Sequence, residues 1–127
     1  MKEVMAVIRM NKINSTKKIL AESGFPSVTC RKVNGRGKKK VNYELIEDLI
    51  GEEPIAEPEI LESISENHRL VAKRLLTMIV DDKDYKKVVD IIIQENKTGN
   101  MGDGRIFVST IDDAIRIRNN DTGVEAI

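Results

Sequence analysis

Short runs of β-branched and aliphatic residues recur along the chain and predict β-strands. "VMAVIR" opens the series at residues 4–9, and "RIFVST" and "AIRIR" close it at residues 105–110 and 114–118. Two further strands are expected at residues 26–33 and 75–80. With two intervening helices, the order is strand-helix-strand, a long insert, strand-helix-strand and one extra strand. This order predicts an α+β, ferredoxin-like βαββαβ fold with an antiparallel sheet, extended by a C-terminal strand.

Apolar residues at helical spacing predict the two helices. In "NSTKKILAESGF", Asn14 or Ser15 suits the N-cap and Gly24 is placed to end the helix. "DKDYKKVVDIIIQEN" predicts the second helix, with Asp82 or Asp84 at its start. Its expected apolar stripe consists of Val88, Val89, Ile92 and Ile93.

A long insert separates the two halves, from about residue 35 to residue 74. Loops beyond roughly 15 residues are usually functional or disordered. Residues 31–40 contain six basic residues and no acid, whereas residues 41–67 contain nine acids and no base. Apolar residues in "YELIEDLI" and "PEILESISENHRL" predict two amphipathic helical stretches. Either these blocks form a solvated surface, or the insert is an arm that recognises a partner.

The composition fits a single domain of residues 1–127. Aromatic residues make up 3% and the formal net charge is zero, so neither base stacking nor bulk electrostatic binding of nucleic acid is expected. The one cysteine, Cys30, cannot form an internal disulfide, which suits a reducing compartment. No apolar run reaches the roughly 18 residues of a membrane span, and residues 1–12 do not resemble a signal peptide. We therefore expect a soluble, cytoplasmic protein.

The segment "TGNMGDGRIFV", residues 98–108, contains three glycines, an aspartate and an arginine before the chain becomes apolar. Glycines permit positive φ angles and close backbone approach, so that successive amides can form an anion-binding nest. Arg105 adds a cation with forked donors suited to phosphate oxygens. The alternative is a glycine-rich turn between a helix and a strand. The pattern GxxxxGK[ST] is absent, which excludes a P-loop.

Arg116 and Arg118 fall on the same face of the last predicted strand, because side chains alternate along a strand. Two guanidinium groups at this spacing repel unless acids or an anion lie near them. Either they face Asp112 or Asp113 on the surface, or they bind a polyphosphate.

The sequence offers little that would support catalysis. Its single histidine, His68, has no serine or cysteine nucleophile nearby in sequence. Asp81 and Asp82 could bind a metal ion, but acids that open a helix more often interact with the helix dipole. We predict a binding protein and not an enzyme, with no catalytic residue and no dedicated metal site.

"TGNMGDGRIFV" and "AIRIR" resemble the C-terminal signature of the nitrogen regulatory P-II proteins. "AVIRMNKINSTKKILAESGFPSVT" followed by "GRGK" is similar to the first strand, helix and second strand of that family, which lead into its flexible T-loop. The likeness covers nearly the whole chain and fails only in the acidic insert. The insert and its flanks look most like the archaeal nitrogenase switch-off branch, in particular its second, long-looped subunit.

This resemblance implies a homotrimer that binds ATP or ADP in each cleft between neighbouring subunits, with a T-loop insert at about residues 36–73. Residues that wrap the phosphates would be Gly102, Asp103, Gly104 and Arg105. Cations that reach the phosphates across the interface would be Arg116 and Arg118. The root of the T-loop would contribute Gly35, Gly37 and Lys38. Residues near the adenine would be Thr29, Thr77 and Ile79, and the residue that pairs with a carboxylate of 2-oxoglutarate would be Lys73.

Three positions depart from the family pattern. Relatives that bind 2-oxoglutarate through Mg-ATP usually have a glutamine where this chain has Lys39, which removes the usual ligand for Mg. Arg105 stands where the family has a lysine, so the charge is kept and the reach changes. Tyr43 lies in the arm but in a different context from the tyrosine that some bacterial relatives uridylylate, so no such modification is predicted.

The resemblance therefore implies a sensor of ATP or ADP and 2-oxoglutarate that regulates nitrogen fixation. Under nitrogen sufficiency it would bind and inhibit dinitrogenase, in a complex with a sister P-II chain. The alternative is a P-II-like nucleotide sensor for another target, an ammonium transporter or an enzyme of carbon or nitrogen metabolism. Partners of other kinds, nucleic acid and the membrane interior, are not expected.

Overall fold

The computed structural model describes residues 1–37 and 70–127. The amphipathic stretches predicted within the insert, with Lys38, Lys39 and Tyr43, lie outside the described residues. The chain divides into two units, residues 1–33 with 73–127 and residues 34–72. Both described α-helices, the core and the glycine-rich segment belong to the first unit.

Four strands form one open antiparallel sheet in the order β2-β3-β1-β4. At its centre, β1 (Lys2–Arg9) pairs antiparallel with β3 (Val71–Val80) and with β4 (Arg105–Thr110). The outer edge beside β3 is β2 (Thr29–Gly35). These strands occur where the sequence predicts them, with ends that differ by a few residues, and the ferredoxin-like fold is confirmed.

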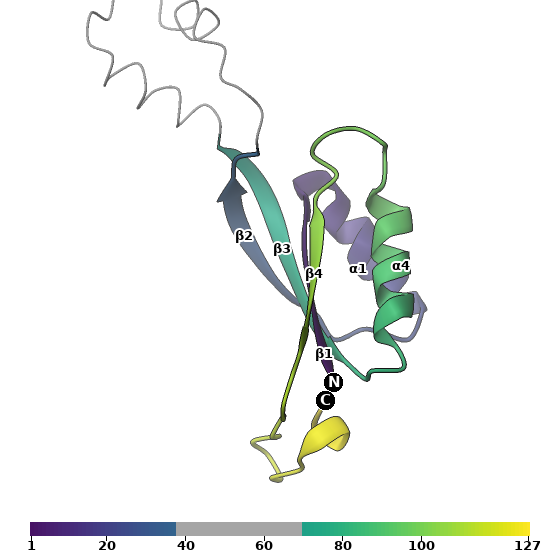
Figure 1. Cartoon of the computed structure of the whole chain (residues 1–127), viewed down its shortest axis with the longest axis vertical. Helices are drawn as coiled ribbons and strands as arrows, with labels where there is room; N and C mark the ends of the chain where they lie inside the picture. The colour runs from purple at the N-terminus through teal and green to yellow at the C-terminus, as the bar shows by residue number, and fades with distance from the viewer. Residues whose placement is uncertain (38–69) are drawn as a thin grey trace, which may run out of the picture. The chain divides into compact units, whose positions relative to one another are not determined.

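Two helices, α1 (Ile13–Glu22) and α4 (Tyr85–Asn96), lie against the same face of the sheet (Figure 1). A 3-10 turn, η1 (Met10–Lys12), joins β1 directly to α1. The predicted N-cap of α1 is therefore wrong: the cap position is Lys12, and the Ser15 hydroxyl donates back to the Lys12 carbonyl at 3.1 Å. The N-cap of α4 is Asp84, as expected, although its side chain makes no capping hydrogen bond.

The end of α1 is the one that the sequence predicts. Gly24 has a φ of +94°, in the left-handed region that glycine adopts at least cost. Its amide donates to the Ala21 carbonyl at 3.1 Å, and the Phe25 amide donates to the Leu20 carbonyl at 2.8 Å. These two bonds form a Schellman motif, which satisfies carbonyls that the helix end would otherwise leave open. Phe25 is partly buried and packs against the core.

The core fills the space between the two helices and the covered face of the sheet. Its strand residues alternate, as expected for a sheet with one covered face. The buried hydrophobic residues are Val4, Ala6, Ile8, Ile13, Leu20, Leu76, Met78, Val80, Val88 and Ile92. Two of the four residues expected in the apolar stripe of α4 are thus in the core, whereas Ile93 is 44% exposed.

A buried polar contact joins the two helices inside this apolar core. The Asn96 amide nitrogen donates to the Thr16 hydroxyl at 3.1 Å and to the Ile92 carbonyl at 2.9 Å. The Thr16 hydroxyl in turn donates to the Lys12 carbonyl at 2.7 Å. Both Thr16 and Asn96 are buried, so the contact links α1 to the last residue of α4 within the core.

The predicted strand over residues 114–118 is wrong for the described chain. Its only ladder contact among the described residues is an isolated bridge between Ile115 and Thr122. The Arg116 amide donates to the Asp121 carbonyl, and the Asn120 amide donates to the Arg116 carbonyl, each at 2.8 Å. These bonds close a tight turn that uses the backbone groups a longer strand would need. A second 3-10 turn, η2 (Gly123–Ala126), follows.

Candidate ligand-binding site

A glycine-rich loop, residues 97–104, connects α4 to β4 at one end of the sheet. Gly99, Gly102 and Gly104 have φ angles of +84°, +97° and +107°, which L-residues rarely adopt. Gly104 also lies against β1: a Cβ there would fall 1.9 Å from the Val7 carbonyl oxygen. The glycines are therefore required by backbone shape at this loop, and at Gly104 by close approach as well.

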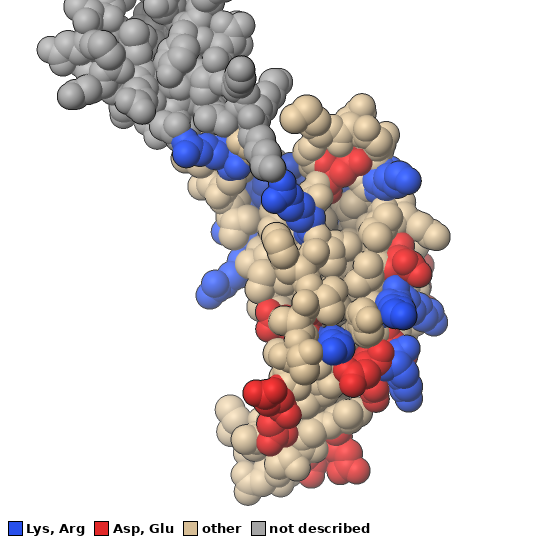
Figure 2. Space-filling model, in the orientation of Figure 1, with Lys and Arg blue, Asp and Glu red and all other residues tan. Residues whose placement is uncertain are grey.

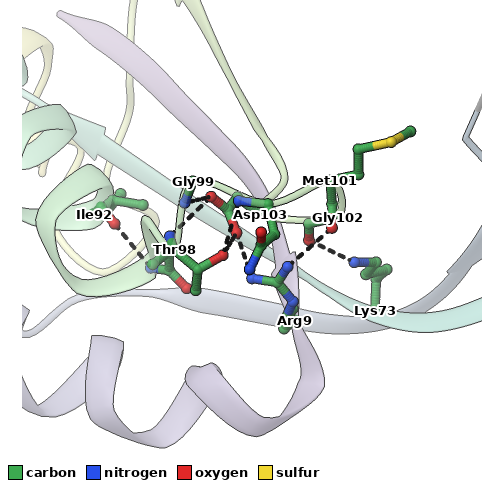
Figure 3. A network of polar contacts seen from close by, with 10 residues as sticks. Arg9, Lys73, Ile92, Thr98, Gly99, Met101, Gly102 and Asp103 are labelled. Carbon is green, nitrogen blue, oxygen red and sulfur yellow. Dashed lines mark hydrogen bonds and ion pairs between the residues drawn. The ribbon is translucent and has the colours of Figure 1, made fainter.

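The carboxylate of Asp103 lies inside the loop and organises it (Figure 3). It accepts hydrogen bonds from the amides of Thr98 and Gly99, each at 2.9 Å, and from the Thr98 hydroxyl. Arg9 donates to the same carboxylate at 2.6 Å. These bonds hold the pKa of Asp103 well below its usual range, and the bonds from Thr98 lower it more than the bond from Arg9 does. Asp103 is thus ionised, and its charge is directed into the loop.

Two cations on neighbouring strands hold the other side of the loop. Arg9 and Lys73 are direct partners across the β1–β3 ladder. Arg9 donates to the Met101 carbonyl at 3.1 Å, and Lys73 donates to the Gly102 carbonyl at 2.8 Å. Like charges at directly opposed positions repel. The loop carbonyls and the Asp103 carboxylate provide the compensating negative charge.

Lys73 shares the open face of the sheet with several other predicted site residues. Since Leu76 and its alternating neighbours are buried under the helices, the odd-numbered side chains of β3 point to the opposite face. The same alternation places the odd-numbered residues of β1 and β4 on this face. The predicted residues on it are Lys73, Thr77, Ile79 and Arg105.

Thr29, expected near the adenine, and the two described root glycines lie on or directly after β2. Thr29 is the exposed first residue of β2. Gly35 ends β2 and Gly37 is the last described residue before the gap. Gly35 and Gly37 belong to the unit of residues 34–72. Their part in the site therefore stays a prediction from the resemblance.

The C-terminal segment, which contains Arg116 and Arg118, follows β4 at the end opposite the glycine-rich loop (Figure 1). Arg116 bonds to the Asp121 carboxylate at 3.1 Å and to the Glu125 carbonyl at 2.7 Å. Of the two surface acids expected beside these arginines, Asp113 instead accepts from the amides of Ala114 and Gly123. Within one chain, the two arginines and the loop therefore do not form one site.

A groove with a volume of about 420 Å³ runs between α4 and β4. Its walls are mostly apolar, and Asp103, Gly104 and Arg105 are among the residues that line it. The predicted adenine-lining residues Thr77 and Ile79 do not line this groove, because they occupy the opposite face of the sheet. Binding at the open face and binding in the groove are thus separate possibilities that share the loop.

Charge is unevenly distributed over the described surface. On the face shown in Figure 2, acidic side chains occupy the end with the C-terminal segment, whereas basic side chains are spread over the middle and the end with the glycine-rich loop, where acidic ones also lie. Among the described residues, no cluster of three or more His, Cys, Asp or Glu side chains could hold a metal ion. Asp81, one of the two acids considered for metal, accepts from the Lys83 amide at 3.2 Å.

Arg9 was not among the residues that the sequence pointed to. A lone arginine at the end of a strand looks like an ordinary surface residue. Its contact with Asp103 spans 94 positions, and no spacing rule connects residues so far apart. The only available signal was Lys73, which the resemblance implied and which turns out to be the cross-strand partner of Arg9.

Comparison with known proteins decides the family. Residues 1–121 match the family described as nitrogen regulatory protein P-II. The chain is a member of the P-II family. Members of this family are regulatory signal transducers, and trimers are typical of it.

Relatives match over the full length of the P-II chain. It is 41% identical over 128 residues to "Nitrogen fixation nifHD region GlnB-like protein 2" of Methanobacterium ivanovii, covering 100% of this chain and 99% of the relative. A protein of the same name from Methanothermococcus thermolithotrophicus is 42% identical over 130 residues, covering 100% and 98%. "Nitrogen regulatory protein P-II" of Pyropia yezoensis is 35% identical over 127 residues, covering 100% of both chains.

Within residues 1–37 and 70–127, no helix is long and apolar enough to cross a membrane.

Proposed function

We propose that this P-II protein senses ATP or ADP and 2-oxoglutarate in the cytoplasm, and that it regulates nitrogen fixation by binding and inhibiting dinitrogenase under nitrogen sufficiency. A sister P-II chain would take part in the inhibitory complex. The observation that carries the proposal is the full-length likeness to relatives named for the nifHD region, at about 40% identity. The glycine-rich loop and the cations beside it give the proposal a physical basis.

Nucleotide would bind on the open face of the sheet, with its phosphates at the glycine-rich loop. Arg105 begins β4 on that face and carries a side chain suited to phosphate oxygens. Thr77 and Ile79 lie further along the same face, where an adenine would pack. Arg116 and Arg118 would come from a neighbouring subunit, since in one chain they lie at the far end of β4.

2-Oxoglutarate would bind at Lys73. The Lys73 ammonium group donates to the Gly102 carbonyl and has two further N–H donors that a carboxylate could accept. An ion pair with a carboxylate would draw the ammonium group away from the carbonyl, because charge-assisted hydrogen bonds are stronger than neutral ones. Effector binding would thereby reach the loop that holds the nucleotide, which gives a direct route for coupling between the two ligands.

The insert would be the part that recognises the target. Its acidic stretch lies between the two roots of the site, Gly35 to Gly37 and Lys73, so its conformation would respond to ligand charge. Its apolar stripes would supply affinity, and its acids would set orientation and salt sensitivity.

Calorimetry and an inhibition assay test the proposal together. The purified protein should bind ATP and ADP, with GTP as the control nucleotide, and should elute as a trimer of its 14.3 kDa chain. With its sister chain it should inhibit purified dinitrogenase, and 2-oxoglutarate with ATP should relieve the inhibition. Replacing residues 42–67 with a short Gly-Ser linker should preserve the trimer and nucleotide binding but abolish inhibition. Inhibition that survives this replacement would contradict the role of the insert.

A second candidate is a nucleotide sensor for an ammonium transporter or a metabolic enzyme. It is favoured by the full-length likeness to P-II proteins whose names mention no nitrogen fixation, such as that of Pyropia yezoensis. Nucleotide-dependent binding to such a target, with no effect on dinitrogenase, would support this candidate instead.

A further inference from the structure

Arg9 makes two separate contacts with the glycine-rich loop from the last position of β1. One guanidinium nitrogen donates to the Asp103 carboxylate at 2.6 Å, and another donates to the Met101 carbonyl at 3.1 Å (Figure 3). The side chains of Arg9 and Asp103 are 26% and 24% exposed, so the pair is partly shielded from water. Neither the resemblance nor the sequence pattern assigned a role to Arg9.

We infer that Arg9 is a positioning residue of the glycine-rich loop, which acts through Asp103 to hold the loop in the shape that receives the phosphates of a nucleotide. This inference rests on the proposed nucleotide function. It also changes the role expected of Asp103, from a ligand contact to the internal anion of the loop.

The Asp103 carboxylate is already saturated by donors from the protein. It accepts from two amides, one hydroxyl and one guanidinium group, which occupy its two oxygens. A second anion brought directly against it would be repelled, and a ligand donor would have to displace one of these bonds. Asp103 therefore suits an internal support better than a direct contact.

Arg9 is the only described side chain outside the loop that a hydrogen bond links to Asp103. The other donors to the carboxylate belong to Thr98 and Gly99, which are in the loop itself. Lys73 holds the loop at a different point, the Gly102 carbonyl. Without Arg9 the loop keeps its internal bonds and the close approach of Gly104 to β1, but loses the side-chain connection between β1 and Asp103.

A loop that is already ordered can bind phosphate with little further loss of conformational entropy. A mobile loop loses that entropy when it binds, so its affinity is lower. Arg9→Gln removes the charge and the fork. It should weaken ATP and ADP binding by about tenfold or more, because charge-assisted bonds contribute at least this much. Adenosine has no phosphates, so its affinity should change by less than about twofold. Lys17→Gln, which removes one exposed positive charge from α1, is the matched control and should leave ATP affinity unchanged.

Calorimetry on Arg9→Gln, Asp103→Asn and the double variant separates a positioning role from direct contact. If Arg9 acts through Asp103, the double variant should bind ATP no more weakly than Asp103→Asn alone. If Arg9 touches the phosphates itself, its effect should persist in the Asp103→Asn background, and the positioning role would be overturned. Unchanged ATP affinity in Arg9→Gln would also overturn it.

Amide hydrogen exchange measured by NMR tests the loop without any ligand. The amides of Thr98 and Gly99 should exchange faster in Arg9→Gln than in the wild type, while amides in the core of β1 should not change. Unchanged exchange at these two amides would contradict the inference. If the wild type binds no nucleotide, the proposed function fails, but this measurement still decides whether Arg9 positions the loop.

Discussion

Gly104 is the position where the backbone of the glycine-rich loop is least able to accept a side chain. A Cβ added there would lie 1.9 Å from the Val7 carbonyl oxygen and 3.0 Å from its carbonyl carbon, and β1 would have to move by about 1 Å to relieve the contact. Gly99 provides the matched control. Its φ of +84° is also positive, but a Cβ there would meet nothing within 4 Å.

The two alanine substitutions should therefore differ in a predictable way. Gly99→Ala should cost about 1 to 2 kcal/mol, the usual penalty for a side chain in left-handed backbone. Gly104→Ala should carry the same penalty plus about 1 to 3 kcal/mol for forcing atoms into an occupied space. It should also disturb the adjacent ladder pair of Val7 and Arg105. The total for Gly104→Ala is then about 2 to 5 kcal/mol.

Urea unfolding followed by circular dichroism, at one fixed protein concentration, measures this difference. With a slope of about 1 to 3 kcal/mol per molar urea for a small protein, the Gly104→Ala midpoint should fall clearly below that of Gly99→Ala. Fixed concentration matters because assembly stabilises folded chains by mass action. Equal midpoints for the two variants would refute the close approach of Gly104 to β1.

Two other predictions concern charged groups. Because the folded state lowers the pKa of Asp103, its carboxylate stabilises the fold fully above the ordinary carboxyl pKa of about 4 and loses that contribution as pH falls toward the folded-state pKa. The stability difference between wild type and Asp103→Asn, measured by urea unfolding, should thus be constant from about pH 8 to pH 5 and shrink below about pH 4; a difference that grows in acid would contradict this. Arg118→Ala should weaken ATP binding about tenfold or more without changing stability, whereas Arg116→Ala should also loosen the C-terminal turn because Arg116 bonds to Asp121. Calorimetry measures ATP binding by the two variants, and limited proteolysis measures how readily the C-terminal turn is cleaved in each. Equal protease sensitivity of the two variants would contradict a structural role for Arg116.

The fold could be predicted from the sequence because one face of the sheet is covered. Alternation in β1 places Val4, Ala6 and Ile8 in the core, and a strand with one buried face shows this period directly. Strand ends were harder to predict. β3 begins at Val71 and not at Leu75, because Lys73 and Arg74 interrupt the apolar run without interrupting the ladder.

Two local predictions, the N-cap of α1 and the last strand, were wrong because the folded chain makes hydrogen bonds other than those that the sequence pattern suggested. Ser15 can cap a helix, but a 3-10 turn had already begun the helical path, so its hydroxyl bonds backward to Lys12. "AIRIR" has the alternation of a strand, but a strand also needs a partner along its length. Within the described chain, the turn after Ile115 uses the backbone groups that such a partner would need.

The candidate site was predictable only in part, for a different reason. Lys73, Asp103 and Arg105 were accessible through the family resemblance. The role of Arg9 depends on the register that places it opposite Lys73 and beside the loop, and register is a property of the assembled sheet. The pattern of residues in a single sequence does not reveal a contact that depends on strand register.

The separation of the loop from the C-terminal arginines leads to a last prediction. If Arg105 and Arg118 serve one nucleotide from different subunits, then Arg105→Ala and Arg118→Ala each damage every cleft of a homotrimer. In trimers formed from an equal mixture of both variants, some clefts combine the intact loop of one chain with the intact Arg118 of its neighbour.

Because a head-to-tail ring gives each cleft one donor of each kind, random mixing should restore about a quarter of the clefts. Calorimetry after unfolding and refolding the two variants together should therefore recover high-affinity ATP binding at about a quarter of the wild-type stoichiometry. The same variants refolded separately and then combined should recover none. No recovery in the co-refolded sample would mean that both residues act within one chain, and the C-terminal segment would then have to reach the loop by a rearrangement of its own subunit.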